Sequence, residues 1–562
     1  MLSKKLADSS GSTPARLAFV QLFVHLCLVF LLAGTPVPDI NESHYLTKAK
    51  HAWDGSFAPG DLFLDSHDSH WLATTLAGGL ARVLPLAAVA WLGRIVCWSL
   101  LVYSWRSLAI SLGISSMLSP LALGAWYLAT SYGNWAGEWA VGGFEAKSLA
   151  YPFILLGIAR AIECRWQSAW VLFGTAVAFH PVAGGWAGLS VGILWLFQPK
   201  LKQRLRAEFL YLLAGTAIGL VGVVPAIVGL TGPNRVGNIV ASQIHVYLRL
   251  PHHLCPRLFA IERHVAAAVS LTALAAATLL AKRVSSKELW HIPTKYSGAI
   301  PGLILKIAWV SVGFSLLGLC IDLLFSGPRP ALASSWLRFY WFRWSDVAVP
   351  LAVTLTVFRW ISLQILPKRE ALVQPTIGQR TLAWGTLSIA VLCNVGQIHH
   401  NWQMTVPIAD RLVVNSVGPI QVSTARYQDW LAACRWIREN SPEDSLWFTP
   451  KYQQTFKWHT GRAEVVCWKD VPQDNRSVHE WYRRITRCDP PRDAQGKTRE
   501  WTTEELLELS REFKFEWILL DRTIQKSPPR FEILYPLNES GRYIDQRSFV
   551  VLRVSKHQLE SD

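Results

Sequence analysis

Charged residues are scarce in this chain, and acidic residues are the scarcer kind. Only 17% of the 562 residues are charged, compared with about 25% in ordinary soluble domains. Hydrophobic residues make up 51% of the sequence, and its mean hydropathy is +0.23. This composition excludes an ordinary soluble globular protein. It indicates an integral membrane protein whose polar C-terminal quarter forms an appended domain.

Two further kinds of pattern are missing. The nine cysteines have no zinc-type spacing, although a Cys467–Cys488 disulfide is compatible with an oxidising compartment. The formal net charge of +16 would suggest a nucleic-acid partner for a soluble protein, but we find no nucleic-acid module. Much of that charge falls instead in loops that set membrane orientation, so we expect no nucleic-acid partner.

Apolar segments recur from Leu17 to about Gly396. We count about eleven of roughly 17 to 25 residues, the length that crosses about 30 Å of hydrocarbon as a helix. The fourth to sixth are short and are compatible with re-entrant segments. No A-x-A cleavage pattern follows the first, so we expect a retained helix. The segments are 17–34, 86–105, 112–130, 147–162, 167–182, 183–198, 208–230, 262–281, 302–326, 346–366 and 381–398.

The positions of Lys and Arg predict the orientation, because cytoplasmic loops keep positive charge. Threading the segments with the N-terminus in the cytoplasm makes every inner loop basic and places the C-terminal domain outside. We therefore expect residues 1–400 to form a transmembrane domain, in a bacterial inner or plasma membrane, and residues 422–562 to form an external α/β domain. The external loops would be 35–70, 131–147, 231–263 and 327–345.

The first external loop concentrates acidic residues just outside the bilayer. Asp39 and Glu42 are followed by Tyr45, and Asp65 and Asp68 come later in the same loop. Carboxylates in this position can serve as a general base or as metal ligands for chemistry on a membrane-borne substrate.

The second external loop places Glu138, Glu145 and Lys147 among glycines and tryptophans. Charged side chains at the mouth of a helix bundle are costly in free energy unless they contact a substrate or a partner. Lys147, at the start of a helix, is suited to binding an anion. The alternative is that the aromatic residues anchor the interface and the charges end the helix. His180, between two apolar segments, could donate to a phosphate oxygen or could be a hydrogen-bonded turn residue.

The last two external loops are cationic. Arg249, His252, His253 and Arg257 lie among apolar residues; we favour anion binding there over a metal site, because adjacent histidines rarely reach one ion with good geometry. Arg338 and Arg343 lie in an aromatic run that suits a lipid head group. The same run is also typical of an interfacial helix whose arginines reach towards the head-group region.

The pattern changes after about residue 422. Residues 427–437 read as an amphipathic helix and residues 445–450 as a strand that ends at a turn. A helix at 503–514, a strand at 517–521 and a last strand at 549–554 follow. This alternation predicts a small α/β domain.

This layout resembles the GT-C superfamily of polytopic glycosyltransferases, which includes protein O-mannosyltransferases and aminoarabinose transferases, and is similar to uncharacterised bacterial membrane proteins. Asp39, Glu42 and Tyr45 resemble the family's first-loop acidic motif, with the two acids further apart than in many members. Asp65 and Asp68 resemble a second acidic cluster that some members carry.

The resemblance implies transfer of a sugar from a polyprenyl-phosphate donor to an acceptor on the external face, with inversion at the anomeric carbon. Asp39 or Glu42 would be the catalytic base. The departing phosphate would be stabilised by cations or by Mg²⁺ or Mn²⁺ held by Asp39 with Asp65 or Asp68, since some branches use a metal. The candidate cations are Lys147, His180, Arg249, His252, Arg338 and Arg343.

The competing class is a polytopic transporter of an anionic or lipid-linked substrate. If the chain were a transporter, we would expect charged residues within the spans and an internal duplication of the helices, and neither is clear in the sequence. A receptor or scaffold would not need about eleven spans. We therefore expect an enzyme whose partners are the bilayer, a polyprenyl-phosphate sugar donor and an acceptor whose class the sequence leaves open.

Overall fold

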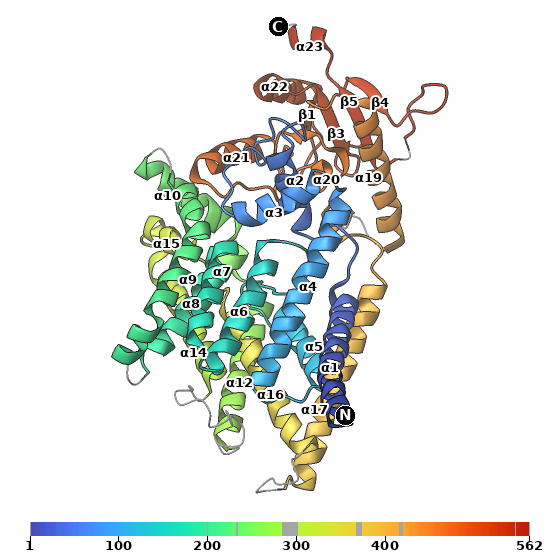
Figure 1. Ribbon diagram of the computed structural model, residues 1–562. Coiled ribbons are helices and arrows are strands. Elements are labelled where there is room, and N and C mark those ends of the chain that lie inside the picture. Colours follow the sequence, from blue (N-terminus) through green and yellow to red (C-terminus); the bar gives the residue numbers. More distant parts are fainter. Residues whose placement is uncertain are drawn as a thin grey trace.

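The computed structural model describes residues 2–198, 201–231, 234–283, 302–366, 374–414, 420–545 and 547–560. A bundle of helices forms one end of the molecule and a small sheet forms the other (Figure 1). The helices of the bundle are α1 (Leu2–Ala33), α4 (Leu86–Ser111), α5 (Ser119–Tyr132), α6 (Ala146–Ile162), α7 (Trp166–Phe179), α8 (Pro181–Leu196), α9 (Leu201–Gly229), α12 (Ile261–Arg283), α14 (Leu303–Phe325), α16 (Ser345–Ile365) and α17 (Ile377–Trp402).

Seven of the described helices are long and apolar enough to cross a membrane: α1, α4, α9, α12, α14, α16 and α17. The chain is accordingly an integral membrane protein. Helices α5 to α8 fall on the other four predicted segments, but they have only 14 to 17 residues. At 1.5 Å per residue they span about 21 to 26 Å, less than the hydrocarbon thickness. All eleven segments are thus helical, but eleven crossings are not confirmed.

Helix α6 lies at the centre of the bundle and is buried along nearly its whole length. It packs between α4 and α7, and α7 packs in turn on α9. A Cβ atom added to Gly174 of α7 would lie 2.1 Å from the carbonyl oxygen of Gly215 on α9. The two backbones are therefore in direct contact, as is typical of small residues between membrane helices.

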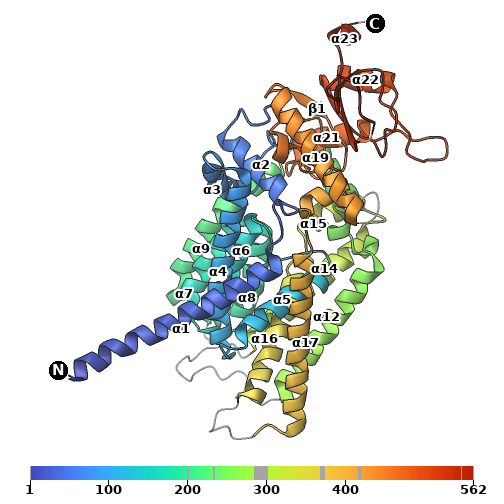
Figure 2. The same cartoon turned by 90° about the vertical axis from the view of Figure 1, so that its right-hand side faces the viewer.

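Short elements from the predicted external loops lie at the end of the bundle that faces the sheet. Helices α2 (Glu42–Trp53) and α3 (Trp71–Ala81) lie between the bundle and the sheet in the view of Figure 1, and the N-terminal part of α1 projects away from the bundle in the view of Figure 2. The other short elements are α10 (Arg235–Gln243), the π-helix η1 (Ile244–Arg249), α11 (Pro251–Leu254), the 3-10 helix η2 (Pro256–Leu258) and α15 (Pro330–Leu337).

The C-terminal region contains a five-stranded mixed sheet in the order β2-β1-β3-β5-β4. Strand β1 is parallel to β2 and β3, and β5 is antiparallel to β3 and β4. The strands are β1 (Leu446–Phe448), β2 (Ala463–Glu464), β3 (Trp517–Asp521), β4 (Glu532–Tyr535) and β5 (Phe549–Arg553). The helices are η3 (Ile408–Asp410), α18 (Arg411–Val414), α19 (Ile420–Asn440), α20 (Phe456–Thr460), α21 (Asn475–Arg487), α22 (Thr503–Phe513) and α23 (Lys556–Glu560).

The predicted elements of this region are confirmed within a few residues: they correspond to α19, β1, α22, β3 and β5. The Cys467–Cys488 disulfide that the sequence allows is not formed, because both cysteines are buried free thiols. The sulfur of Cys467 instead lies within 4.8 Å of carboxylate oxygens of Glu464 and Asp470.

Candidate functional site

A cavity of about 560 Å³ opens where the bundle meets the short external elements. The first loop, the junction of α7 and α8, helix α9, and the segment that follows α15 all contribute to its walls. Its lining residues are Tyr45, Ser69, His70, His180, Pro181, Val182, Gly185, Trp186, Leu189, Val223, Ala226, Ile227, Leu230, His245, Trp336, Arg338, Phe339, Tyr340, Trp341, Arg343 and Gln473. Four predicted site residues are among them: Tyr45, His180, Arg338 and Arg343.

One side of this cavity is apolar and is built by membrane helices. Leu189 of α8 and Val223 and Ile227 of α9 face it, and Trp186 completes the wall. The indole N–H of Trp186 donates to the carbonyl oxygen of Phe339 at 2.8 Å, which holds the segment after α15 against α8. This side is suited to a hydrocarbon chain.

The other side carries imidazoles and phenols. The rings of His70 and His180 stack with their centroids 4.9 Å apart, and the phenol oxygen of Tyr340 lies 3.3 Å from Nε2 of His245. Nδ1 of His180 accepts the N–H of Ala183 at 3.1 Å, so the ring proton is on Nε2 when this histidine is neutral. Burial lowers the pKa of His180, which keeps it neutral and makes Nε2–H a hydrogen-bond donor.

Two arginines complete the polar side. Arg338 donates to the hydroxyl of Ser242 at 2.8 Å and to the amide oxygen of Asn475 at 3.0 Å. Burial lowers its pKa to about 10, so it stays cationic at neutral pH. Arg343 lies 2.5 Å from a carboxylate oxygen of Glu138. Burial opposes its charge, but the nearby Glu138 carboxylate raises the pKa of Arg343 above its ordinary value.

Glu138 and the other charged residues of the second loop form a buried network beside the cavity. The ammonium of Lys147 lies 3.1 Å from Glu138 and 3.3 Å from Glu145. Asn41 of the first loop donates to the other oxygen of Glu145 at 3.1 Å. Burial raises the pKa of Glu145, and the attraction of Lys147 works against that rise. The network therefore ties Arg343 to the first loop through paired charges.

Glu42 is fully buried, and both of its oxygens are occupied. It accepts from Nε and Nη2 of Arg94 at 2.7 and 2.6 Å, from the N–H of Phe144 at 2.8 Å, and from the N–H of Asp39 at 2.7 Å. Arg94 lies within the membrane helix α4 and is also fully buried. With four donors on its carboxylate, Glu42 is suited to fixing the first loop rather than to taking a proton.

Asp39 is less constrained than Glu42. Its Oδ1 accepts the N–H of Ile40 at 2.6 Å. Burial, and then the negative charge of Glu42, raises the pKa of Asp39. A Cβ atom added to Gly143 would lie 2.7 Å from Cβ of Asp39, so glycine allows the second loop to lie against this carboxylate.

The later acids of the first loop lie in separate environments. Asp65 is half-exposed and pairs with His51 at 2.9 Å. Oδ1 of Asp68 accepts the backbone N–H of His70 at 2.8 Å, whereas Oδ2 of Asp68 and Nδ1 of His70 are buried without a hydrogen-bond partner. Among the described residues, the group of three possible metal ligands does not include Asp39, Asp65 or Asp68. A metal held by Asp39 with Asp65 or Asp68 stays a prediction.

Four predicted phosphate-binding residues do not line the cavity: Arg249, His252, His253 and Arg257. Arg257 pairs with Asp322 of α14 at 3.4 Å. His253 bonds to the carbonyl oxygen of Ala136 through Nδ1. Each of these two residues therefore has a packing role at a loop, which sequence spacing alone could not distinguish from ligand binding.

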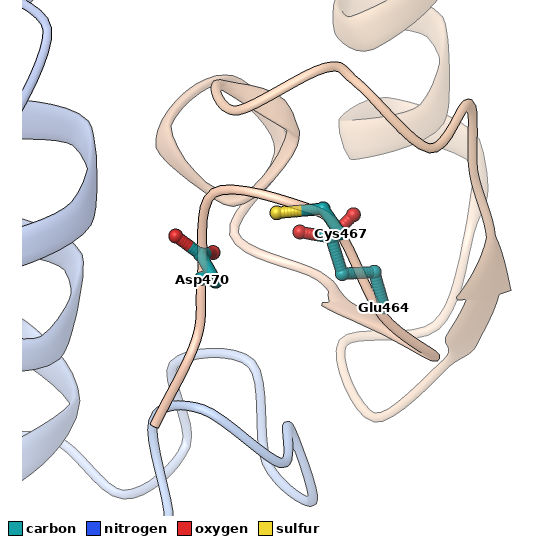
Figure 3. A group of neighbouring side chains, drawn as sticks. All are labelled: Glu464, Cys467 and Asp470. Atoms are coloured by element: carbon teal, nitrogen blue, oxygen red, sulfur yellow. The ribbon is translucent and has the colours of Figure 1, made fainter. Parts of the chain in front are cut away.

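The described residues do contain one group with metal-ligand spacing, Glu464, Cys467 and Asp470 (Figure 3). The ammonium of Lys457 lies 2.6 Å from Glu464 and 2.5 Å from Asp470, and 3.2 Å from Asp61 of the first loop. It takes the position that a cation would occupy, so this group does not fit a metal ion.

The same cluster joins the C-terminal region to α2. Nδ1 of His44, which lies on α2 beside Tyr45, is 2.7 Å from the second oxygen of Asp470. Lys457 and His44 hold the pKa of Asp470 well below its ordinary value, although burial acts in the opposite direction. Helix α2 is thus held between the Glu42–Arg94 pair on the membrane side and Asp470 on the sheet side.

The similarities between this chain and known proteins are distant. Residues 428–488 match the model of a domain of unknown function (DUF6798), and no curated protein matches the chain. The arabinofuranosyltransferase AftD from Mycobacteria is similar in structure at 13% identity and a TM-score of 0.46, over 96% of this chain. This chain spans only 40% of the length of that enzyme.

The oligosaccharyltransferase of Archaeoglobus fulgidus is also similar in structure. Tethered to an acceptor peptide it has 11% identity and a TM-score of 0.42, over 90% of this chain and 69% of its own. With an inhibitory peptide and a dolichol-phosphate it has 9% identity and a TM-score of 0.40, over 96% and 76%. Both neighbours are membrane glycosyltransferases of the GT-C superfamily. At these TM-scores, the function of this chain has to be argued from its own site.

Two residues were not singled out from the sequence: Arg94 and Gln473. Arg94 carried a usable signal, because a charged residue within an apolar span is rarely without a function. Gln473 comes from the C-terminal region and reaches the cavity through the fold alone.

Proposed function

We propose that this chain is a membrane glycosyltransferase that moves a sugar from a polyprenyl-phosphate donor to an acceptor hydroxyl. The observation that carries the proposal is the cavity of about 560 Å³, which joins an apolar wall of membrane helices to a polar side of arginine, histidine and tyrosine. A polyprenyl phosphate likewise joins an apolar hydrocarbon chain to a polar phosphate. Cavities of this size are ordinary for small-molecule sites.

The donor would lie with its hydrocarbon chain along α8 and α9 and with its phosphate on the polar side. Arg338 and Arg343 would provide charge and directed hydrogen bonds to the phosphate oxygens. His180, neutral and protonated on Nε2, would add one further donor. Because these groups are already held by Ser242, Glu138 and Ala183, little reorganisation is needed when the phosphate becomes the leaving group.

Asp39 is our proposed general base. It would take the proton of the acceptor hydroxyl as the hydroxyl oxygen forms a bond to the anomeric carbon. The bond from that carbon to the phosphate oxygen breaks, and its electron pair leaves with the lipid phosphate. Attack from the face opposite the phosphate inverts the configuration. A base in this position commonly contributes about 10²- to 10⁴-fold to the rate.

Glu42 would act through Asp39 as a positioning residue. It accepts the N–H of Asp39 and is itself fixed by Arg94, so it orients the loop that carries the base. In this proposal Asp39 takes the proton and Glu42 positions Asp39, two roles that the sequence motif alone does not assign.

A divalent cation, if the enzyme uses one, would be held by Asp68 and His70. Their Oδ2 and Nδ1 atoms are buried without partners, and carboxylate and imidazole are ordinary ligands of divalent ions. When bound, such an ion would supply positive charge to the departing phosphate.

We also propose that the cavity faces the external side, with the N-terminus in the cytoplasm and residues 422–562 outside, because in this orientation the Lys- and Arg-rich segments between the spans are cytoplasmic. The charged groups near the membrane give the transporter alternative no support. Asp322 is paired with Arg257, and Asp346 accepts the N–H groups of Trp135, Ala136 and Glu138, so both acids hold loops in place.

The test is sugar transfer in membranes that express the wild type, Asp39→Asn or Arg343→Gln, with radiolabelled polyprenyl-phosphate sugars and with or without a chelator. We expect transfer by the wild type, a loss of about 10²-fold or more in Asp39→Asn, and weakened donor binding in Arg343→Gln. Arg487→Gln, a change in an exposed ion pair of α21, is the matched control. Transfer that persists in Asp39→Asn would refute the assignment of the base.

A further inference from the structure

A second cationic group lies close to the base but does not line the cavity. It consists of Arg249, His252, Arg263 and Lys469, and we call it the cationic cluster. Arg249 donates from Nε to the carbonyl oxygen of Trp468 at 2.9 Å and from Nη2 to that of Lys469 at 3.3 Å. Arg263 donates to the amide oxygen of Asn134. Arg249 of η1 thus lies against the C-terminal region, Arg263 of α12 lies against the second loop, and the charges of Arg249, Arg263 and Lys469 all act on His252 of α11.

The cations of this cluster have no direct ion-pair partner. Among the described residues, no carboxylate lies within 4 Å of Arg249, Arg263 or Lys469, whose hydrogen-bond partners are carbonyl and amide oxygens. Glu145 and Asp470 attract Lys469 from a greater distance, but each of these carboxylates is itself paired with another cation. Burial and then the charges of Arg249, Arg263 and Lys469 lower the pKa of His252 to about 4. Burial and then Arg249 lower the pKa of Lys469 to about 8. Three cations without a direct carboxylate partner, beside acids that pair with other cations, create a field that favours a bound anion.

The cluster is accessible and ordered. The side chain of His252 is exposed, and Arg263 and Lys469 are half-buried, whereas Arg249 is buried at 7% exposure. The guanidinium of Arg249 also lies 5.5 Å from the ring of Trp468. An anion could therefore reach the cluster from solvent and meet side chains that are already held in place.

The cluster is linked directly to the first loop. Nζ of Lys469 donates to the amide oxygen of Asn41 at 2.7 Å, and the amide nitrogen of Asn41 donates to Glu145 at 3.1 Å. Asn41 is two residues from Asp39. A molecule held by Lys469 would thus be next to the loop that carries the proposed base, on groups separate from the donor cavity.

We propose that the cationic cluster binds an anionic group, carboxylate or phosphate, of the acceptor. That the bound molecule is the acceptor rests on the proposed function, whereas the binding of an anion does not. The acceptor would be a hydroxyl compound with at least one negative charge beside the reacting hydroxyl. Its anion would contact Arg263, His252 and Lys469, while its hydroxyl would point to Asp39. A neutral acceptor would leave these cations without a partner.

Binding can be measured without turnover, on the full chain in lipid nanodiscs. The probe is a fluorescent oligogalacturonate, and the matched neutral probe is a malto-oligosaccharide of the same length. We expect the anionic probe to bind with an affinity that falls as salt rises, and the neutral probe to bind at least about tenfold more weakly. Competition by inorganic phosphate against free galacturonate then tells which anion the cluster prefers.

Variants locate the site. Lys469→Met and Arg263→Met should each weaken binding of the anionic probe about tenfold, and Lys469→Arg should restore most of it. Arg487→Met, on the exposed face of α21, is the control for a lost surface charge. Equal binding of the two probes, or unchanged binding in both Met variants, would overturn the proposal.

A donor-side control separates this proposal from the proposed function. Arg343→Gln should keep the anionic probe bound while losing affinity for polyprenyl phosphate in vesicles. If the probe binds at the cluster but no sugar is ever transferred, the anion site stands and the proposed function fails. If transfer occurs with equal efficiency to neutral and anionic acceptors, the proposed function stands and the anion site fails.

Discussion

The buried pair of Glu42 and Arg94 gives the sharpest prediction, because removing either partner leaves the other charge buried without its counter-charge. Arg94→Met removes both charged donors of a fully buried carboxylate and leaves it with two backbone N–H groups. Removing one partner of such a pair typically costs about 3 to 5 kcal/mol. Glu42→Gln keeps the shape but leaves the guanidinium without a counter-charge, so we expect a cost of similar size.

The double variant Arg94→Met/Glu42→Gln should be more stable than Arg94→Met alone, because no unpaired charge stays buried. The assay is denaturant unfolding of the protein in detergent, followed by fluorescence of its 28 tryptophans. A coupling free energy of about 2 kcal/mol or more between the two sites is expected. The reasoning would be refuted if the two single changes were additive, or if both cost less than about 1 kcal/mol.

Three further predictions concern other groups. Burial raises the pKa of Asp39 above the ordinary value of 3.8, and the base acts only when it is deprotonated. The rate of transfer should therefore fall with decreasing pH already above pH 3.8. A pH–rate profile whose acid limb lies at or below 3.8 would contradict this. Lys457→Met should cost about 3 to 5 kcal/mol in the same unfolding assay, because three carboxylates lose their ammonium. Because the pKa of Asp470 is lowered by folding, its contribution to stability is present above about pH 4 and should be lost as pH falls further, which unfolding at pH 3 to 7 can measure.

The parts of the fold that depend on local pattern could be predicted from the sequence. All eleven apolar segments are helical, and α22 and β3 have nearly the expected bounds, because 3.6-residue and 2-residue periodicities are properties of short stretches. Strand β2 was missed, since its two residues have no period to detect and are defined only by pairing with β1.

The site was predicted less completely, for a physical reason. Tyr45, His180, Arg338 and Arg343 line the cavity, and they could be singled out because polar residues that interrupt apolar runs are visible in sequence. The different roles that we propose for Asp39 and Glu42 could not be predicted, because Arg94, which pairs with Glu42, lies 52 residues further along the chain. Sequence spacing places two acids in one turn, but only tertiary pairing decides which one stays available for a proton.

The donor cavity and the cationic cluster, which lie on two sides of the first loop, differ in whether their cations are paired with carboxylates. On the donor side Arg343 is neutralised by Glu138, so an arriving lipid phosphate must compete with a carboxylate or share the guanidinium with it. On the cluster side Arg249 and Lys469 have only neutral oxygens as partners. An anion that binds there has no carboxylate to displace, so we expect the acceptor to bind even when the donor site is empty. Product-inhibition kinetics should therefore show acceptor binding that does not require donor, and strict donor-first kinetics would contradict this.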